Sequence, residues 1–304
     1  MWTGEKMKFI KGKYSFAIIY AIILILVSVF VMYDALKLEK DAIKVEKNEF
    51  SKEEYEKVEK IVEENKYQDE NISINISYDR IYDSEVYIAD VKIKDIKYLK
   101  SAFAKNKFGK NVVDVTSNMA KENNAIFAIN GDYYGFRTEG FVIRNGVMYR
   151  DSARKSGKDS CLLIFNDGTI DIIYERSTVL QDEIDKAKLN NNEIVQAYTF
   201  GPGLVYDGEI INGEEEEDLN VHPRMAIGML EPLHYVMVAV DGRTNESVGI
   251  TIRQLAEYML QKGCNIAYNL DGGSSATMYF NGRIINKPSS FEEREVSDIV
   301  YIGY

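Results

Sequence analysis

An acid, two glycines and two serines directly follow an apolar stretch in YNLDGGSSATMYFNG, near the C-terminal end of the chain. The polar residues are Asp271, Gly272, Gly273, Ser274 and Ser275. The apolar residues before them predict a buried strand, so this polar group lies at a strand end, where ligand sites gather. The glycines allow close approach to the backbone and can leave N–H groups facing an anion, and the serines add hydroxyls. A glycine-rich turn that caps a helix is the simpler interpretation.

Three other apolar stretches carry polar residues at one end. HYVMVAV leads to Asp241 and Arg243, an acid beside a guanidinium that suits a phosphate or a carboxylate. HPRMAIG places Arg224 just before a short strand. NAIFAIN ends at Asn130 and is followed by Gly131, Asp132 and Tyr133. Taken singly these are a surface ion pair, a surface arginine and a hairpin, but four such clusters in one domain favour a binding or catalytic site.

Hairpins are the elements that the sequence predicts most clearly. Asn-Gly or Asp-Gly pairs separate apolar or alternating segments in RNGV, NDGT, YDGE and FNGR. Helices are fewer: TSNMAKENN and KSAFAKNKF are candidates, and TIRQLAEYMLQKG has a capping box of Thr251 and Gln254 and a terminal Gly263. Because strands outnumber helices, we expect an α+β domain over residues 71–304, with a large, mixed, hairpin-rich sheet and a few helices.

The N-terminal part of the chain predicts a membrane anchor. Residues 14–33 are twenty positions without a charge, enough for a helix to span the ~30 Å hydrocarbon core. A cleaved signal peptide is the alternative, and an uncleaved signal anchor is favoured over it. Lysines lie closer to the span on its N-terminal side, which favours a cytoplasmic tail over residues 1–13. We therefore expect a single-pass cell-membrane protein whose C-terminal domain is extracellular.

The segment between anchor and domain, residues 34–70, is rich in Lys and Glu and contains no Gly or Pro. Ser51 and Glu54 have the capping-box spacing, and Tyr55, Val58 and Val62 follow at helical spacing. This pattern predicts a charged helical stalk that holds the domain away from the membrane. A short coiled-coil dimer is the alternative.

Composition narrows the partners of the protein. The 304 residues carry a formal charge of −11, which argues against nucleic acid as a partner. Cys161 and Cys264 could form one disulfide or remain two free thiols. With two histidines and no zinc-like spacing, no metal ligand set is assigned; a divalent cation such as calcium could bind near the strand-end acids. The acidic run EEEED (214–218) is interpreted as a solvated loop tip.

In this order the motifs resemble the phosphodiester glycosidase domain, a family that includes bacterial envelope proteins. The likeness runs from about residue 84 to the C-terminus and is most specific in NLDGGSSATM with the Asn-Gly pair that follows. The family often has a third glycine where this chain has Ser274. The resemblance implies a hydrolase that cleaves a sugar from a phosphodiester at the anomeric carbon.

The same resemblance suggests roles for the strand-end residues. Asp241 and Asp271 are the candidates for activating water or stabilising the sugar cation, and Arg224 is the candidate for catalytic phosphate binding. The residues implied to bind substrate are Asn130, Gly131, Asp132, Tyr133, Arg243, Gly272, Gly273, Ser274 and Ser275. The substrate would be a phosphodiester-linked glycan of the cell envelope or of an exopolysaccharide. A non-catalytic glycan-binding protein that assists exopolysaccharide biosynthesis is the alternative function, and a membrane-tethered scaffold is a third.

Overall fold

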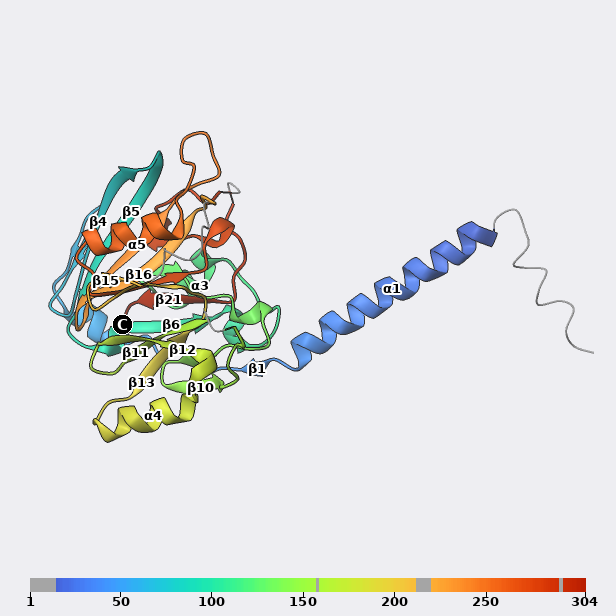
Figure 1. The fold of residues 1–304 in the computed structure, drawn as a ribbon, viewed down its shortest axis with the longest axis horizontal. Helices are drawn as coiled ribbons and strands as arrows, with labels where there is room; N and C mark the ends of the chain where they lie inside the picture. The colour runs from blue at the N-terminus through green and yellow to red at the C-terminus, as the bar shows by residue number, and fades with distance from the viewer. Residues whose placement is uncertain (1–14, 157–158, 212–219, 290–291) are drawn as a thin grey trace, which may run out of the picture.

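The computed structural model describes residues 15–156, 159–211, 220–289 and 292–304 (Figure 1). In these ranges strands outnumber helices, and the α+β class is confirmed. Every pairing between the described strands is antiparallel, whereas the sequence predicted a mixed sheet. Short hairpins account for the pairs that are consecutive in the chain, such as β4 with β5 and β16 with β17, because a tight turn can join only antiparallel neighbours.

The largest sheet has nine strands in the order β15-β14-β18-β16-β17-β5-β4-β3-β2. Its strands are β2 (Ile61–Val62), β3 (Lys66–Gln68), β4 (Ile72–Ile81), β5 (Ser84–Ile93), β14 (Gly203–Tyr206), β15 (Glu209–Ile210), β16 (Arg224–Glu231), β17 (His234–Val240) and β18 (Ile266–Leu270). β17 and β18 are buried along their whole length, as their unbroken apolar sequences predicted.

Two five-stranded sheets pack beside it, in the orders β10-β9-β13-β11-β12 and β20-β19-β8-β21-β6. The strands of the first are β9 (Val142–Arg144), β10 (Val147–Arg150), β11 (Ser160–Phe165), β12 (Ile170–Tyr174) and β13 (Ile194–Tyr198). Those of the second are β6 (Leu99–Phe103), β8 (Phe127–Asn130), β19 (Met278–Phe280), β20 (Arg283–Ile284) and β21 (Asp298–Ile302). Met225 and Tyr268 of the nine-stranded sheet share one buried cluster with Phe127 and Val300 of the second.

All four predicted hairpins form, joining β9 to β10, β11 to β12, β14 to β15 and β19 to β20. At Asn145-Gly146 the φ angles are +51° and +79°, the left-handed pair that a two-residue turn between twisted strands requires. Short 3-10 helices are η2 (Ile96–Tyr98), η3 (Ala104–Asn106), η4 (Tyr134–Phe136), η5 (Glu175–Ser177) and η6 (Gly273–Ser275).

Helices cover the outer faces of the sheets. They are α3 (Thr116–Glu122), α4 (Leu180–Leu189) and α5 (Ile252–Gln261). The capping box of Thr251 and Gln254 opens α5, and Leu255 and Met259 pack against the nine-stranded sheet. The predicted helix KSAFAKNKF is wrong: it forms β6, η3 and β7 (Lys107–Phe108), because pairing of β6 with β21 overrides its local helix propensity. Cys161 and Cys264 are both free and buried.

At the N-terminus, α1 (Ser15–Lys40) projects away from the sheets (Figure 1). Its residues Phe16–Asp34 have a mean hydropathy of 2.8 and none of this window is buried, so by length and composition the helix could cross a membrane. It is the one such helix among the described residues.

The charged segment that follows is not a helical stalk, and this prediction is wrong. After Lys40 the chain forms β1 (Ile43–Lys44), then the short helix α2 (Lys52–Lys57), and then β2 and β3 at the edge of the large sheet. The capping box at α2 is also absent, because Ser51 makes no side-chain cap and Glu54 bonds instead to Lys97 and Tyr98. The Lys/Glu-rich composition suits a helix, but partners far along the chain offer better pairing.

Residues of this segment are bound tightly to the domain. Asn48 Nδ2 donates to Ser101 O at 2.8 Å and to the Tyr301 hydroxyl at 2.7 Å. Tyr55 packs on Tyr304 with ring centroids 5.6 Å apart, and Tyr67 is 2% exposed. The folded domain therefore begins near residue 41 rather than at residue 71.

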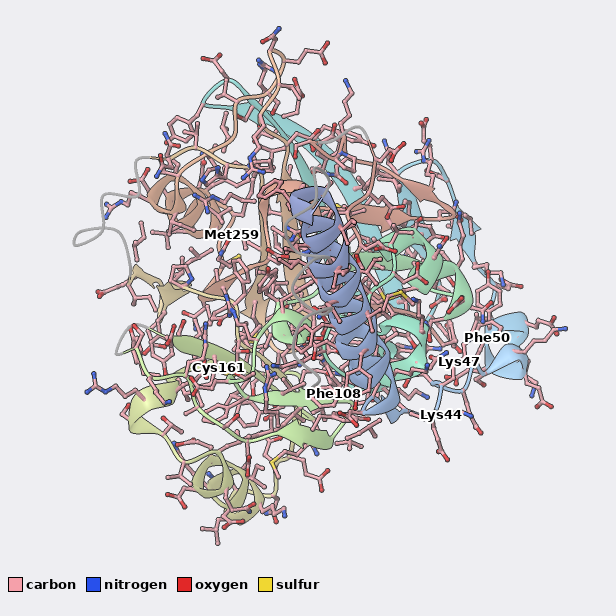
Figure 2. All side chains as sticks on the ribbon, turned by 90° about the vertical axis from the view of Figure 1, so that its right-hand side faces the viewer. Lys44, Lys47, Phe50, Phe108, Cys161 and Met259 are labelled. Atoms are coloured by element: carbon pink, nitrogen blue, oxygen red, sulfur yellow. The ribbon has the colours of Figure 1, made fainter. Side chains whose placement is uncertain are left out.

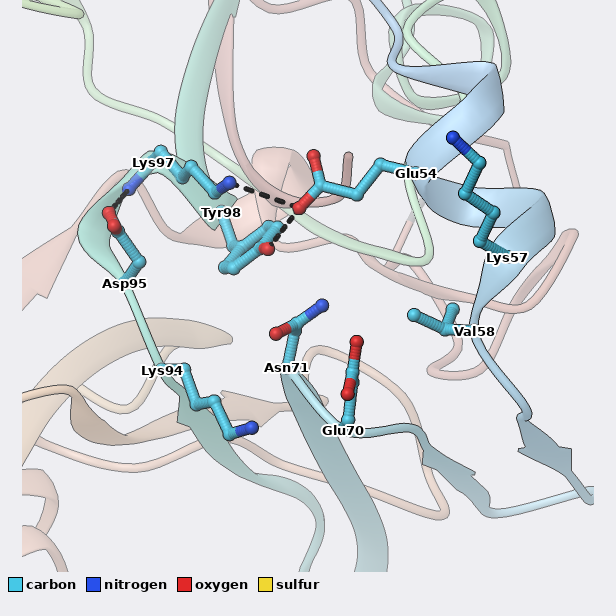
Figure 3. A pocket seen from close by; sticks show the side chains of 9 residues that line it. All are labelled: Glu54, Lys57, Val58, Glu70, Asn71, Lys94, Asp95, Lys97 and Tyr98. Carbon is cyan, nitrogen blue, oxygen red and sulfur yellow. Dashed lines mark hydrogen bonds and ion pairs between the residues drawn. The ribbon is translucent and has the colours of Figure 1, made fainter.

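Where α2 meets the domain, a surface hollow of about 440 Å³ opens (Figure 3). Its lining residues are Glu54, Lys57, Val58, Glu70, Asn71, Lys94, Asp95, Lys97 and Tyr98. Asn71 Nδ2 also donates to the hydroxyl of Tyr304. Tyr304 follows the C-terminal end of β21, whereas Asp298 is at the N-terminal end of that strand. The hollow therefore belongs to the docking of the N-terminal segment, away from the strand-end clusters.

Candidate active site

Two of the predicted clusters meet where β8 and β18 end. The Asn130 side chain joins them: its Nδ2 donates to Asp271 O at 2.7 Å, and its Oδ1 accepts from Thr277 N at 3.1 Å. Asn130 is 0% exposed, so its amide is used within the chain. Its geometry supports a positioning role rather than contact with sugar hydroxyls.

Gly131 is required by the close approach of β21. Its N donates to Asp298 O at 2.9 Å, and Asp271 N donates to Gly131 O at 3.3 Å. A Cβ at position 131 would lie 2.3 Å from Asp298 Oδ1. This glycine therefore shapes the site through its backbone.

Behind this junction lies a buried ion cluster. Arg144 Nη2 is 3.0 Å from Asp132 Oδ2, and Arg144 Nε donates to Asp298 Oδ2 at 2.7 Å. Burial opposes the charge of Arg144, but the carboxylates of Asp298 and Asp132 outweigh it and raise its pKa. The carboxylate of Asp132 also accepts from Thr199 N at 2.9 Å and from Tyr134 N at 2.8 Å. Asp132 is thus a fixed anchor for the loop after β8, and its predicted role as a substrate ligand has no support in this geometry.

Asp271 is the acid best placed for chemistry. Its carboxyl is hydrogen-bonded to Ser275, and the positive charges of Arg294 and Arg137 are near enough to stabilise its ionised form. Burial raises its pKa to about 6, against the opposing effects of the Ser275 hydrogen bond and of the two positive charges. Arg294 Nη1 also donates to Ser275 Oγ at 3.5 Å, and Arg137 Nη1 donates to Thr199 O at 2.8 Å. A carboxyl of this kind changes charge near neutral pH beside two fixed cations.

Aromatic rings complete this part of the site. Tyr133 and Phe136 stack with centroids 4.6 Å apart. Arg294 lies 6.0 Å from each of these rings, and Arg137 lies 5.4 Å from those of Tyr133 and Phe200. The arrangement offers an aromatic face and two guanidinium forks beside one carboxyl, which suits a sugar joined to a phosphate.

The loop after Asp271 also touches the third and fourth clusters. Gly273 N donates to Pro223 O at 2.8 Å, next to Arg224. Arg243 is exposed and lies over the same loop, since a Cβ at Gly273 would be 3.2 Å from its two terminal nitrogens. Arg224 is largely buried, and its Nε donates to Ile250 O at 2.9 Å. Arg243 is therefore an accessible cation of the loop, while Arg224 supports it from the strand below.

Asp241 is buried and bonded to the backbone. Lys287 N donates to its two carboxylate oxygens at 3.1 and 3.0 Å, and Asn286 Nδ2 donates at 3.1 Å. Asn286 continues to the glycine-serine loop, donating to Ala276 O at 3.0 Å. Burial raises the pKa of Asp241, and these hydrogen bonds oppose the rise. Asp241 therefore braces the loop and is a weaker candidate for catalysis than Asp271.

The remaining predicted site residues lie in that loop. Gly272 and Ser274 are half-buried, and Ser275 is fully buried. No group of three or more His, Cys, Asp or Glu side chains in the described ranges could hold a metal ion, so the suggested calcium site has no matching cluster there. The acidic run 214–218 lies outside the described residues.

Comparison with known proteins places this geometry in a family. The family model of the phosphodiester glycosidase domain matches residues 123–303. The chain belongs to the phosphodiester glycosidase family. Its α+β fold is similar to the catalytic domain of zebrafish N-acetylglucosamine-1-phosphodiester alpha-N-acetylglucosaminidase, with a TM-score of 0.60 and 21% identity, over 77% of this chain and 83% of that one.

Two curated proteins show the extent of the sequence similarity. The SPbeta prophage-derived uncharacterized protein YomE of Bacillus subtilis is 35% identical over 196 residues, which are 62% of this chain and 29% of that protein. The bovine N-acetylglucosamine-1-phosphodiester alpha-N-acetylglucosaminidase is 39% identical over 69 residues, which are 23% of this chain and 13% of that enzyme. The chain thus spans less than a third of the length of either relative.

Two site residues, Arg137 and Arg294, were not predicted from the sequence. Both lie in loops with no apolar periodicity around them, so only their spatial approach to Asp271 reveals them. The available signal was position: Arg137 follows the AINGDYYG motif closely, and Arg294 lies between the NG motif and the last strand.

Proposed function

We propose that this protein is a membrane-anchored, extracytoplasmic hydrolase that cleaves sugar-1-phosphodiester bonds in cell-envelope or exopolysaccharide glycans. Membership of the phosphodiester glycosidase family supports the reaction class. The observation that carries the proposal is the buried carboxyl of Asp271, whose pKa is raised to about 6 beside Arg137 and Arg294. The apolar helix Phe16–Asp34 supports the anchor.

The chemistry assigns separate tasks to these groups. Water adds to the anomeric carbon while the bond from that carbon to the phosphate oxygen breaks, giving free sugar and a phosphate monoester. Phosphate is a good leaving group, so the main needs are cations on its oxygens and a carboxylate near the oxocarbenium-like carbon. Arg137 and Arg294 hold the phosphate, with Arg243 over the loop that follows Asp271. Asp271 accepts the proton of water or stabilises the sugar cation, and Tyr133 stacks on the ring.

The test is release of free sugar from p-nitrophenyl N-acetylglucosamine-1-phosphodiester by the full chain in detergent micelles. Asp271→Asn is expected to lower kcat by roughly 10²–10⁴-fold, the usual contribution of a catalytic acid or base. Arg137→Gln and Arg294→Gln are expected to lower kcat/KM by at least about tenfold. Asp207→Asn and Arg283→Gln, in the surface hairpins β14–β15 and β19–β20, are matched controls that should keep normal rates.

Two results would contradict the proposal. Normal turnover by a folded Asp271→Asn variant would remove this residue from the mechanism. Binding of the substrate without sugar release by the parent chain would favour the glycan-binding alternative.

A further inference from the structure

The tether between the apolar span and the folded domain is short. The span ends at Asp34, and α1 continues for six residues to Lys40, which is about 9 Å of helix. This is comparable to the headgroup layer on one side of a bilayer, roughly 5–8 Å. Two residues then separate α1 from Ile43, the first residue of β1. The folded domain therefore begins at the membrane surface.

The tether is also fixed to the domain. β1 pairs with β7, Ile43 opposite Phe108, and Val45 N donates to Asn106 O at 2.9 Å. Ala42 packs on Gly109, where a Cβ would lie 2.7 Å from the Cβ of Ala42. Figure 2 shows Phe108 and Lys44 close to the base of α1. The chain thus enters the domain at one defined place.

This attachment point lies directly behind the candidate site. The ring of Phe108 stacks on that of Tyr134, with centroids 5.1 Å apart and an interplanar angle of 12°. Tyr134 follows Tyr133, and its N donates to Asp132 Oδ1. β1 and β7 are separated by the usual distance between paired strands, and Phe108 of β7 stacks on Tyr134. β1 therefore lies about 10 Å from the ring of Tyr134.

The site loop is on the side of the domain from which α1 leaves. In Figure 1 the C-terminus lies on the opposite side of the domain from α1. β21 leads towards that terminus, so Asp298 at its start, with Gly131 bonded to it, lies towards α1. Phe136, in the same loop, is 39% exposed beside Tyr133 and the two arginines. An exposed aromatic ring next to cations suits the boundary between lipid and water.

We infer that the substrate is held in the same membrane: a sugar phosphodiester whose aglycone is a membrane lipid. The inference rests on the proposed hydrolysis and names its substrate class. Water adds to the anomeric carbon, the sugar leaves free, the lipid keeps a phosphate monoester, and the proton from water passes to Asp271 or to solvent. Confining enzyme and substrate to one surface layer raises their effective concentration. The chain carries a formal charge of −11, so its net charge gives no attraction to an anionic surface, and the proposed anchor supplies the attachment.

The position of the site can be tested without turnover. Trp2 is the single tryptophan, so a Trp2→Phe variant has no tryptophan fluorescence and can receive a new tryptophan at a chosen position. In vesicles of phosphatidylcholine and phosphatidylglycerol containing headgroup spin-labelled lipid, Phe136→Trp should be quenched strongly. Tyr78→Trp, on β4, is the matched control: it is 51% exposed and should not be quenched. Equal quenching at the two positions, or none at Phe136→Trp, overturns the inference.

The substrate class is tested with the full chain in vesicles containing polyprenyl phosphate N-acetylglucosamine, compared with the water-soluble p-nitrophenyl phosphodiester. We expect at least about tenfold faster release from the lipid-linked substrate. A long Gly/Ser insertion between Asp41 and Ala42 should abolish this advantage and leave the rate on the soluble substrate unchanged. Equal rates on both substrates, or an advantage that survives the insertion, overturn the inference alone. Release from neither substrate contradicts the proposed hydrolysis, and the inference with it.

Discussion

At the scale of single residues, Asp271 makes the site sensitive to pH. Burial raises the pKa of its carboxyl to about 6, so the carboxyl changes from mostly protonated to mostly ionised around that pH. If the ionised form accepts the proton of water, kcat/KM should rise with pH through a midpoint near 6. Measuring kcat/KM from pH 4.5 to 8 checks this, because that ratio reports ionisation of the free enzyme. A rate that instead falls through pH 6 would make Asp271 a proton donor.

The same shift predicts a pH-dependent stability. An acid whose folded pKa lies above its unfolded value stabilises the fold at low pH, and that contribution is lost as pH rises through the folded pKa. For a change from 3.8 to about 6, the loss is about 3 kcal/mol. Asp271→Asn removes it, so the variant should gain stability relative to the parent between pH 4 and pH 7.5. Thermal melts of both proteins at pH 4 and pH 7.5 check this. If the difference in melting temperature between variant and parent is the same at both pH values, Asp271 has no raised pKa in the folded protein.

Gly131 offers a sharper steric prediction. Gly131→Ala brings a methyl group within 2.3 Å of Asp298 Oδ1, beside the buried Arg144 cluster. We expect a loss of about 1–3 kcal/mol in unfolding free energy and a strong fall in activity. Gly303→Ala is the matched control, since its nearest heavy atom would be 3.4 Å away. A normal melting temperature for Gly131→Ala in denaturation experiments would show that β21 can move aside.

The residue types needed at the site were predictable, but several of their roles were not. The sequence pointed to Asp271 and Tyr133, which face the arginine pair. It assigned Asp241 to catalysis and Asn130 and Asp132 to substrate binding, although hydrogen bonds to distant residues occupy all three side chains. Such bonds depend on partners far along the chain, which local patterns do not specify.

At the scale of elements, local signals predicted the hairpins and α5 because turn residues and caps act within a few positions. The stalk prediction was wrong for the opposite reason: Ile43 pairs with Phe108, and Asn48 donates to the hydroxyl of Tyr301, both far along the chain. A Lys/Glu-rich sequence contains no sign of such pairings.

A truncation measures what this segment contributes. A fragment of residues 71–304 loses Asn48, Tyr55 and the buried Tyr67, whereas residues 41–304 keep them. Burying one such aromatic ring contributes about 1.5–3 kcal/mol. The shorter fragment should therefore melt roughly 6–12 °C lower, for a loss of about 3 kcal/mol or more. Identical melting temperatures for the two fragments would show that residues 41–70 do not stabilise the domain.

At the scale of the whole molecule, labelling of an introduced cysteine can test whether the domain lies outside the cell, as proposed. Cys161 and Cys264 are 0% and 1% exposed, so the described domain offers no accessible native cysteine. Tyr82→Cys places a thiol where the side chain is 51% exposed. A membrane-impermeant maleimide should label this variant in intact cells. Labelling that requires cell lysis would place the domain in the cytoplasm.

The position of β21 has a consequence for how the protein is made. β21 lies between β8 and β6 in its sheet. The hydroxyl of Tyr301 accepts a hydrogen bond from Asn48, and the ring of Tyr304 packs on that of Tyr55. Neither the sheet nor the packing of the N-terminal segment can be completed until residues 298–304 have been synthesised. In the proposed topology, a chain anchored by its first helix therefore crosses the membrane unfolded, with the edges of β8 and β6 still unpaired. Such long-range pairing folds slowly and exposes the chain to aggregation, so export in the proposed topology should depend on chaperones outside the cell membrane.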